Sequence, residues 1–139
     1  MYTYEYPRAA VTADAVIFRY EQEVLNVLLI ERANEPFKGC WALPGGFMDM
    51  DEDAMTCAIR ELKEETGLVV ESMEQVAAFS DVDRDPRGRT VSITYSAVVT
   101  CSEVQAADDA AQVRWFPVDA LPPLAFDHAR ILKEAIARL

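Results

Sequence analysis

Three glutamates near the middle of the chain form the pattern with the clearest chemistry. Glu61, Glu64 and Glu65 are spaced i, i+3 and i+4, so on a helix their side chains fall within an arc of about 100°. Like charges at this spacing repel one another, more so when they are shielded from solvent. A hard divalent cation would relieve that repulsion through its preference for oxygen ligands. A solvated acidic helix face has the same spacing, and three residues alone do not decide between the two.

The negative charge of the chain is concentrated around these glutamates. The 139 residues include 24 acidic and 13 basic ones, which gives a net charge of −11 at pH 7. Between positions 49 and 75, nine acidic and two basic residues leave a balance of −7. We therefore expect neither nucleic acid nor an anionic membrane as a partner. A phosphate-containing ligand would need cations between itself and these carboxylates.

Composition argues against several other kinds of site. A single histidine, His128, cannot supply a metal site that needs two imidazoles. Cys40, Cys57 and Cys101 lack CxxC spacing, which predicts reduced thiols in a cytoplasmic protein. Neither a signal peptide nor an apolar run long enough to span a membrane is present. His128 falls on the apolar face of the last predicted helix, where we expect a buried, hydrogen-bonded imidazole.

The glutamates belong to a longer pattern that covers 23 residues. Its nine specified positions are Gly46, Glu52, Arg60, Glu61, Leu62, Glu64, Glu65, Gly67 and Leu68. Five residues separate the first two positions, seven precede Arg60, and one stands on each side of the Glu64–Glu65 pair. This order resembles the signature of the Nudix hydrolase family at every specified position, and residues 41–45 resemble the family's approach strand. The resemblance favours a cation site over a solvated helix face.

The resemblance implies roles for individual residues. The ligands implied for Mg²⁺, with Mn²⁺ as an alternative, are the carbonyl of Gly45 and the carboxylates of Glu61, Glu64 and Glu65. The residues implied to take part in catalysis are Glu61, Glu64 and Arg60, and the supporting ones are Gly46, Glu52 and Gly67. Glu52 is expected either to pair with Arg60 or to reach a metal through water. Such cations would orient a water molecule and stabilise the charge that develops on the phosphates.

The general base stays open at this level. Glu61 is one candidate, and the others are Glu103, Asp108 and Asp109 in the acidic segment 102–111. A base must reach the attacking water by a hydrogen bond, which the sequence does not specify. A solvated turn rich in Ala and Asp is the competing interpretation of that segment.

Residues outside the signature bear on the substrate. The segments 84–89, 91–95 and 124–128 resemble the branch of the family that contains ADP-ribose pyrophosphatases. The resemblance implies hydrolysis of ADP-ribose to AMP and ribose 5-phosphate. The alternatives are a (d)NTP pyrophosphohydrolase that releases pyrophosphate and a non-catalytic module that senses ADP-ribose. Because all four signature glutamates are intact, we expect an enzyme rather than a sensor.

Three arginines are candidates for substrate binding, and three tyrosines for contacts at the N-terminus. Arg84, Arg87 and Arg89 could contact phosphate or ribose, although charged turn residues also simply keep a hairpin soluble. The tyrosines alternate as on a strand, at Tyr2, Tyr4 and Tyr6. They suit edge-strand packing, stacking on adenine, or a second subunit. By analogy with the branch, a homodimer is expected.

One α/β domain over residues 1–139 must position these groups. Alternation and apolar runs predict strands over residues 11–18, 24–30, 40–43, 69–79, 90–101 and 112–118, the first two as a hairpin. Helical periodicity predicts helices over 53–66, capped by Gly67, and over 127–139, with Asp127 as N-cap. Residues 44–46 predict a sharp bend. With the family resemblance, the expected fold is a Nudix-type α/β/α sandwich with a mixed central sheet.

Overall fold

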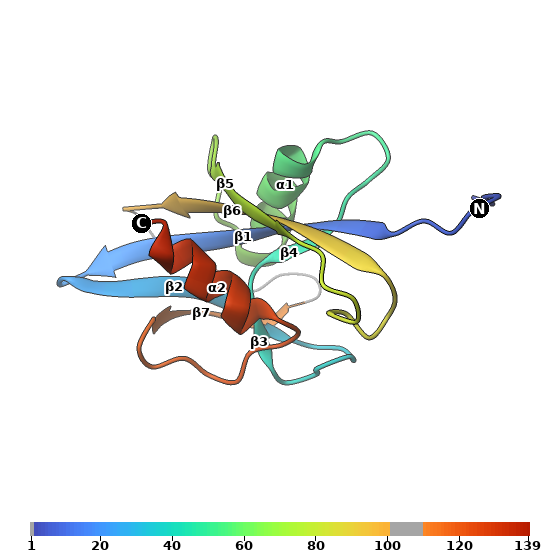
Figure 1. Cartoon of the computed structure of the whole chain (residues 1–139). Helices are drawn as coiled ribbons and strands as arrows, with labels where there is room; N and C mark the ends of the chain where they lie inside the picture. Colours follow the sequence, from blue (N-terminus) through green and yellow to red (C-terminus); the bar gives the residue numbers. More distant parts are fainter. Residues whose placement is uncertain (1, 101–109) are drawn as a thin grey trace.

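The central β-sheet of the molecule is mixed, with one parallel pair of strands among antiparallel pairs. The computed structural model describes residues 2–100 and 110–139, and Figure 1 shows their arrangement. The strands of this part of the chain are β1 (Ala10–Glu21), β2 (Val24–Arg32), β3 (Trp41–Ala42), β4 (Gly45–Phe47), β5 (Glu74–Phe79), β6 (Thr90–Val98) and β7 (Ala110–Pro117). The helices are α1 (Ala54–Thr66) and α2 (His128–Ala137).

The sheet is built around β1. This strand runs parallel to β6 and forms an antiparallel hairpin with β2 through Gln22 and Glu23. Both turn residues have positive φ angles, 50° and 69°, the geometry of a two-residue turn that matches strand twist. The paired strands follow the order β3-β2-β1-β6-β5, with β4 added against β1 and β7 against β2. The predicted hairpin is therefore present, and both of its strands are longer than expected.

Apolar residues on both faces of the sheet explain why it carries a helix on each side (Figure 1). Successive side chains of a strand point to opposite faces. In β1, Val16 and Phe18 pack in a core with α2, whereas Ala15 and Ile17 pack in a second core with α1. The predicted α/β/α sandwich with a mixed sheet is thus confirmed. Among the described residues, no helix has both the length and the apolar composition of a membrane span.

The helix that carries the glutamates has the predicted boundaries to within one residue. Asp53 is its N-cap rather than its first residue, and the Asp53 carboxylate accepts a hydrogen bond from the Thr56 N–H at 2.8 Å. At the other end Gly67 has φ 77° and donates its N–H to the Lys63 carbonyl at 2.9 Å. Leu62 and Leu68 are buried on either side of this cap, so the apolar stripe orients the helix against the sheet.

Two predicted elements were wrong in part. The strand expected over 69–79 begins only at Glu74. Leu68 and Met73 are buried in the core that contains α1, whereas Val69, Glu71 and Ser72 between them are exposed. The bend expected over 44–46 is confined to Pro44, since residues 45–47 form β4 and pair with β1. The backbone approaches closely there: a Cβ on Gly45 would lie 2.5 Å from the Ala13 carbonyl oxygen. Close packing, not a turn, requires this glycine.

The remaining elements differ from expectation at their ends. The predicted strands 40–43, 90–101 and 112–118 are observed at 41–42, 90–98 and 110–117, and Cys101 lies outside the described residues. The last helix was expected over 127–139 and spans His128–Ala137. Asp127 occupies its N-cap position but makes no side-chain capping hydrogen bond, because its carboxylate binds Arg84 instead.

Candidate active site

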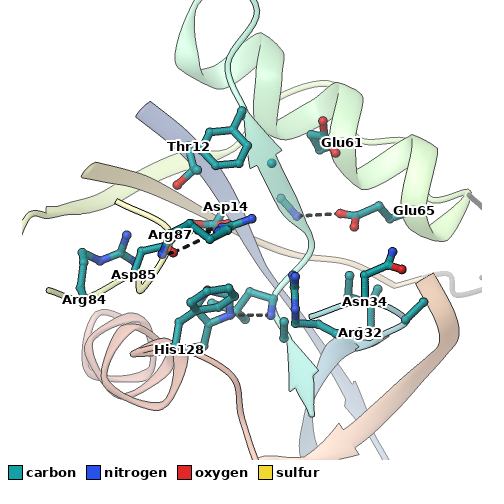
Figure 2. Close-up of a pocket in the computed structure, with 18 of the residues that line it drawn as sticks. Thr12, Asp14, Arg32, Asn34, Glu61, Glu65, Arg84, Asp85, Arg87 and His128 are labelled. Atoms are coloured by element: carbon teal, nitrogen blue, oxygen red, sulfur yellow. Dashed lines mark hydrogen bonds and ion pairs between the residues drawn. The ribbon is translucent and has the colours of Figure 1, made fainter. Parts of the chain in front are cut away.

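A cavity of about 440 Å³ lies where β1, β2 and β4 meet α1 and the start of α2 (Figure 2). Two groups of residues give it opposite charge. The helix side consists of Glu61 and Glu65 on α1. The loop side consists of residues from the β5–β6 connection and from the chain around the start of α2, namely Arg84, Asp85, Arg87, Phe126 and His128. The other charged residues of the lining are Asp14 on β1, Arg32 at the end of β2, and Glu35 in the loop that follows.

Arg60 gathers the signature carboxylates around one guanidinium. Its Nε and Nη2 donate to the Glu52 carboxylate at 2.9 and 2.6 Å. Its Nη1 donates to Glu61 at 2.8 Å and to Glu64 at 3.2 Å. The hydrogen bonds from Arg60 to Glu52 lower the pKa of Glu52 to about 2. The predicted pairing of Glu52 with Arg60 is present, and it ties the loop before α1 to the helix.

Gly46 and Gly45 bring two glutamates of α1 against the backbone of β4. A Cβ on Gly46 would lie 2.6 Å from the Glu61 carboxyl carbon, so a side chain there would push Glu61 away. Glu65 accepts a hydrogen bond from the Gly45 N–H at 2.8 Å. Burial raises the pKa of Glu61. The structure thus brings Gly45, Gly46, Glu61 and Glu65 together, while the Glu64 side chain remains about half exposed beside them.

The carboxylates are not in metal-binding positions in this structure. Within residues 2–100 and 110–139, no three His, Cys, Asp or Glu side chains are gathered closely enough to hold a metal ion. Arg60 supplies the positive charge among them, bridging Glu61 and Glu64. The donor set nevertheless fits a hard cation, because it offers carboxylate oxygens on one helix face.

The three arginines predicted to bind substrate occupy different environments. Arg84 lines the cavity, but its side chain is only 5% exposed and forms a two-point ion pair with Asp127 at 2.7 and 2.9 Å. Arg89 is absent from the lining and donates to the Asp81 carbonyl. Arg87 lines the cavity and remains 39% exposed. The structure therefore brings Arg84 and Arg87 to the cavity and leaves Arg89 outside it.

Arg87 is held in place from several sides. Its Nε and Nη2 donate to the Asp85 carboxylate at 3.1 and 2.7 Å, and its guanidinium lies over the rings of Phe47 and Phe126 at 4.9 and 5.1 Å. Burial alone would raise the pKa of Asp85, but its bonds to Arg87 lower it. A guanidinium fixed in this way loses little conformational freedom when it binds an anion.

His128 is buried, as the sequence predicted, and hydrogen-bonded. The Leu43 N–H donates to its Nδ1 at 3.0 Å, which places the proton of a neutral ring on Nε2. Burial lowers the pKa of His128 to about 4, so the ring is neutral at physiological pH. The bond joins the first residue of α2 to the segment that leads into Gly45, across 85 positions of sequence.

Several cavity residues were missed at the sequence level. Arg32 carries no local pattern that marks it, whereas Asp85 and Phe126 fall in the segments 84–89 and 124–128 that resemble the branch but were not named as site residues. Asp14 does carry a signal, because it is the one charged residue in the stretch 10–18, whose other residues are small or apolar. It is 6% exposed, and burial raises its pKa to about 6. The candidate bases Glu103, Asp108 and Asp109 lie outside the described residues.

The NUDIX domain model matches residues 8–139, nearly the whole chain. This chain belongs to the NUDIX domain family. The resemblance of its signature to the Nudix family is therefore confirmed. Membership of the family, together with the similarity to an ADP-ribose pyrophosphatase, supports the activity of a Nudix hydrolase that cleaves phosphoanhydride bonds. Nudix hydrolases generally use divalent metal ions, in agreement with the oxygen-rich donor set of α1.

Proteins similar to this Nudix chain include an ADP-ribose pyrophosphatase and two proteins whose names link them to ADP-ribose. An ADP-ribose pyrophosphatase of Methanocaldococcus jannaschii is 43% identical over 129 residues, 93% of this chain and 74% of that protein. An ADPR responsive transcriptional repressor, NtrR, of Acinetobacter baylyi is 41% identical over 97% of this chain, which spans only 56% of the repressor. The NUDIX domain of Shewanella oneidensis NrtR, solved in complex with ADP ribose, has a TM-score of 0.87 and 36% identity, with 96% and 90% of the two chains covered.

Proposed function

We propose that this Nudix domain hydrolyses ADP-ribose to AMP and ribose 5-phosphate, with Mg²⁺ or Mn²⁺ as cofactor. The observation that carries the proposal is the division of one cavity into a carboxylate side on α1 and a guanidinium on the β5–β6 connection. The names of two similar proteins, an ADP-ribose pyrophosphatase and a domain crystallised with ADP ribose, support the choice of substrate.

The charges of the helix side require a divalent cation for this reaction. Carboxylates repel a diphosphate at close range, so Glu61, Glu64, Glu65 and the Gly45 carbonyl would hold the ion. When bound, the ion would polarise phosphate oxygens and lower the pKa of a water molecule. Arg60 keeps the loop of Glu52 on the helix and offsets part of the negative charge. Gly46 leaves room for the Glu61 carboxylate, and Gly67 ends the helix after Glu65.

The loop side would bind those phosphate oxygens of the diphosphate that the cation on the helix side does not contact. Arg87 presents a partly exposed guanidinium at the cavity, and guanidinium groups pair well with phosphate oxygens. Arg84 would act through its buried pair with Asp127, which shapes the wall of the cavity, and Arg89 would contribute only long-range charge. One water adds to phosphorus as one P–O bond of the anhydride breaks, which yields two monophosphates.

The base that takes the proton from this water is proposed among the residues already named. Glu61 is suited to the role because it lines the cavity and burial raises its pKa. Glu103, Asp108 and Asp109 remain candidates from the sequence. Glu61→Gln removes both a metal ligand and a candidate base, so a loss of activity alone does not identify the base. The pH profile of kcat would therefore be measured for variants of Glu61, Glu103, Asp108 and Asp109, and the base is the residue whose replacement shifts that profile.

A second candidate function is favoured by one observation. The Acinetobacter repressor that responds to ADPR is 41% identical to this chain, so the same cavity could bind ADP-ribose without hydrolysing it. The complete set of signature glutamates favours turnover. As partners we expect the small nucleotide and a second copy of the chain, with neither nucleic acid nor membrane. The free thiols of Cys40 and Cys57 agree with the expected cytoplasmic location.

Product analysis tests the proposal. ADP-ribose, other nucleoside diphosphate sugars and (d)NTPs would be incubated with the chain in Mg²⁺ and in Mn²⁺, and products identified by mass spectrometry. AMP with ribose 5-phosphate is the expected result. A nucleoside monophosphate with pyrophosphate from a (d)NTP, in preference to ADP-ribose, would replace the proposed substrate. Tight binding of ADP-ribose without turnover in either metal would favour the sensor.

A further inference from the structure

Polar side chains interrupt the apolar face of the sheet at the floor of the cavity. Thr12 and Asp14 on β1 share a face with Val16 and Phe18, which belong to the α2 core. On the neighbouring parallel strand, Ser92 pairs in register with Thr12, and Thr94 with Asp14. All four polar residues are less than 8% exposed. Buried polar groups are costly unless they are hydrogen-bonded, so this arrangement calls for an explanation.

The two strands contribute different parts of the arrangement. Thr12 and Asp14 line the cavity. The Ser92 hydroxyl donates to the Asp14 carboxylate and lies 3.4 Å from the Thr94 hydroxyl, both beneath the floor and fully buried. The uncharged Ser92 hydroxyl therefore orients Asp14 from behind. Gly45 confines it from the side, since a Cβ on that residue would lie 2.1 Å from Asp14 Oδ1.

We infer that Asp14, with Thr12 beside it, binds a ribose hydroxyl of the substrate and so helps to determine specificity. This inference rests on the function proposed above. A carboxylate accepts hydrogen bonds and repels phosphate, so it suits an uncharged part of the ligand. Thr12 can both donate and accept, as a ribose hydroxyl does. Phe47, which pairs with Thr12 across β1 and β4, and Phe126 both lie against the Arg87 guanidinium. A flat base stacked on these rings would have its ribose next to Thr12 and Asp14.

A cycle between the protein and its substrate tests this assignment. Wild type and Asp14→Asn would be assayed with ADP-ribose, with analogues that lack single hydroxyls on either ribose, and with the inosine analogue that lacks the adenine amino group. We expect Asp14→Asn to lower kcat/KM for ADP-ribose about tenfold, mainly through KM, since a hydrogen bond to a charged group typically contributes that much. For one deoxy analogue, the effects of Asp14→Asn and of the missing hydroxyl should not add. With that analogue, Asp14→Asn should lower kcat/KM by less than about twofold.

The ribose whose deoxy analogue shows this coupling is the one that Asp14 binds. Asp119→Asn, the same change on an exposed turn, should leave every ratio unchanged. Additive losses with all deoxy analogues would overturn the inference, and so would coupling only with the inosine analogue. A fall in kcat for every substrate with an altered Mg²⁺ dependence would assign Asp14 to the metal site instead. If wild type fails to hydrolyse ADP-ribose, the proposed function fails, and the same cycle measured by calorimetric binding still tests Asp14.

Discussion

The two sides of the cavity are encoded at very different ranges in the sequence. On the helix side, Glu61 and Glu65 and the neighbouring Glu64 lie within five consecutive residues, and helical periodicity alone puts them on one face. On the loop side, Arg84 is fixed by Asp127, 43 positions away, and His128 binds Leu43 across 85 positions. The helix side can therefore be recognised as a motif, whereas the loop side exists only in the folded chain.

The sides also differ in how their charges are balanced. Arg60 serves several carboxylates at once, so the helix side keeps an excess of negative charge that a cation would relieve. On the loop side each arginine has its own carboxylate, Asp127 for Arg84 and Asp85 for Arg87. A helix-side variant should therefore affect metal-dependent chemistry, and a loop-side variant should affect ligand binding or stability.

The largest effect is expected from a change on the helix side. Glu64→Gln keeps the size of the side chain and removes its charge, so turnover should fall by about 100-fold or more because transition-state stabilisation is lost. The fold should survive, since Glu64 is about half exposed. Steady-state kinetics at saturating Mg²⁺ and Mg²⁺ titration by calorimetry measure the two consequences.

Glu134→Gln is the matched control for Glu64. Glu134 is also a helical glutamate in an exposed i,i+4 pair with an arginine, Arg138. Both rates and metal affinity should be unchanged in this variant. Full activity of Glu64→Gln would contradict its assignment to the metal site and would make Glu61 and Glu65 the remaining carboxylate ligands.

An intermediate effect is expected on the loop side. Arg87→Ala should raise KM for ADP-ribose by about tenfold or more, because a charge-assisted hydrogen bond to phosphate is lost, while kcat changes less. Arg87→Lys should recover only part of the loss, since an ammonium lacks the two-point geometry that Asp85 fixes.

Arg138→Ala removes an exposed arginine that also pairs with a carboxylate, at a position outside the cavity lining. Its kinetics should match those of wild type. If Arg87→Ala instead lowered kcat and left KM unchanged, the division of labour between the two sides would be wrong.

The smallest effect concerns stability and pH. The pKa of His128 is about 4 when folded and near 6.5 otherwise, so between these values the unfolded chain binds more protons. The stability that neutral His128 contributes is thus fully present above about pH 6.5 and is lost as pH falls toward 4. Between pH 7 and 5 this amounts to about 1–2 kcal/mol.

His128→Asn isolates this contribution from other titrating groups. Asn keeps an acceptor near the position of Nδ1 for the Leu43 N–H but does not titrate. The free energy of unfolding would be measured with denaturant at pH 7, 6 and 5. As pH falls, wild type should lose stability relative to the variant. A difference that stays constant with pH would mean that His128 is not held neutral by burial.

Particular residues show how far the sequence could be interpreted. Asp53 and Gly67 predicted the ends of α1 because capping depends on a few neighbouring residues. Gly45 was expected in a bend and lies in β4, since pairing with β1 is a long-range contact. Asp127 was expected to cap α2 and binds Arg84 instead, because a buried guanidinium from another loop competes for its carboxylate.

By itself the sequence determined the family signature, the acidic face of α1, the positions of the main strands and helices, and a buried His128, all of which depend on local spacing and hydrophobicity. The tertiary structure alone decided that Arg87 reaches the cavity while Arg89 does not, and that Asp14 forms part of its floor. These outcomes depend on which strands pair and which loops meet, and such contacts are set by packing over the whole chain rather than by neighbouring residues.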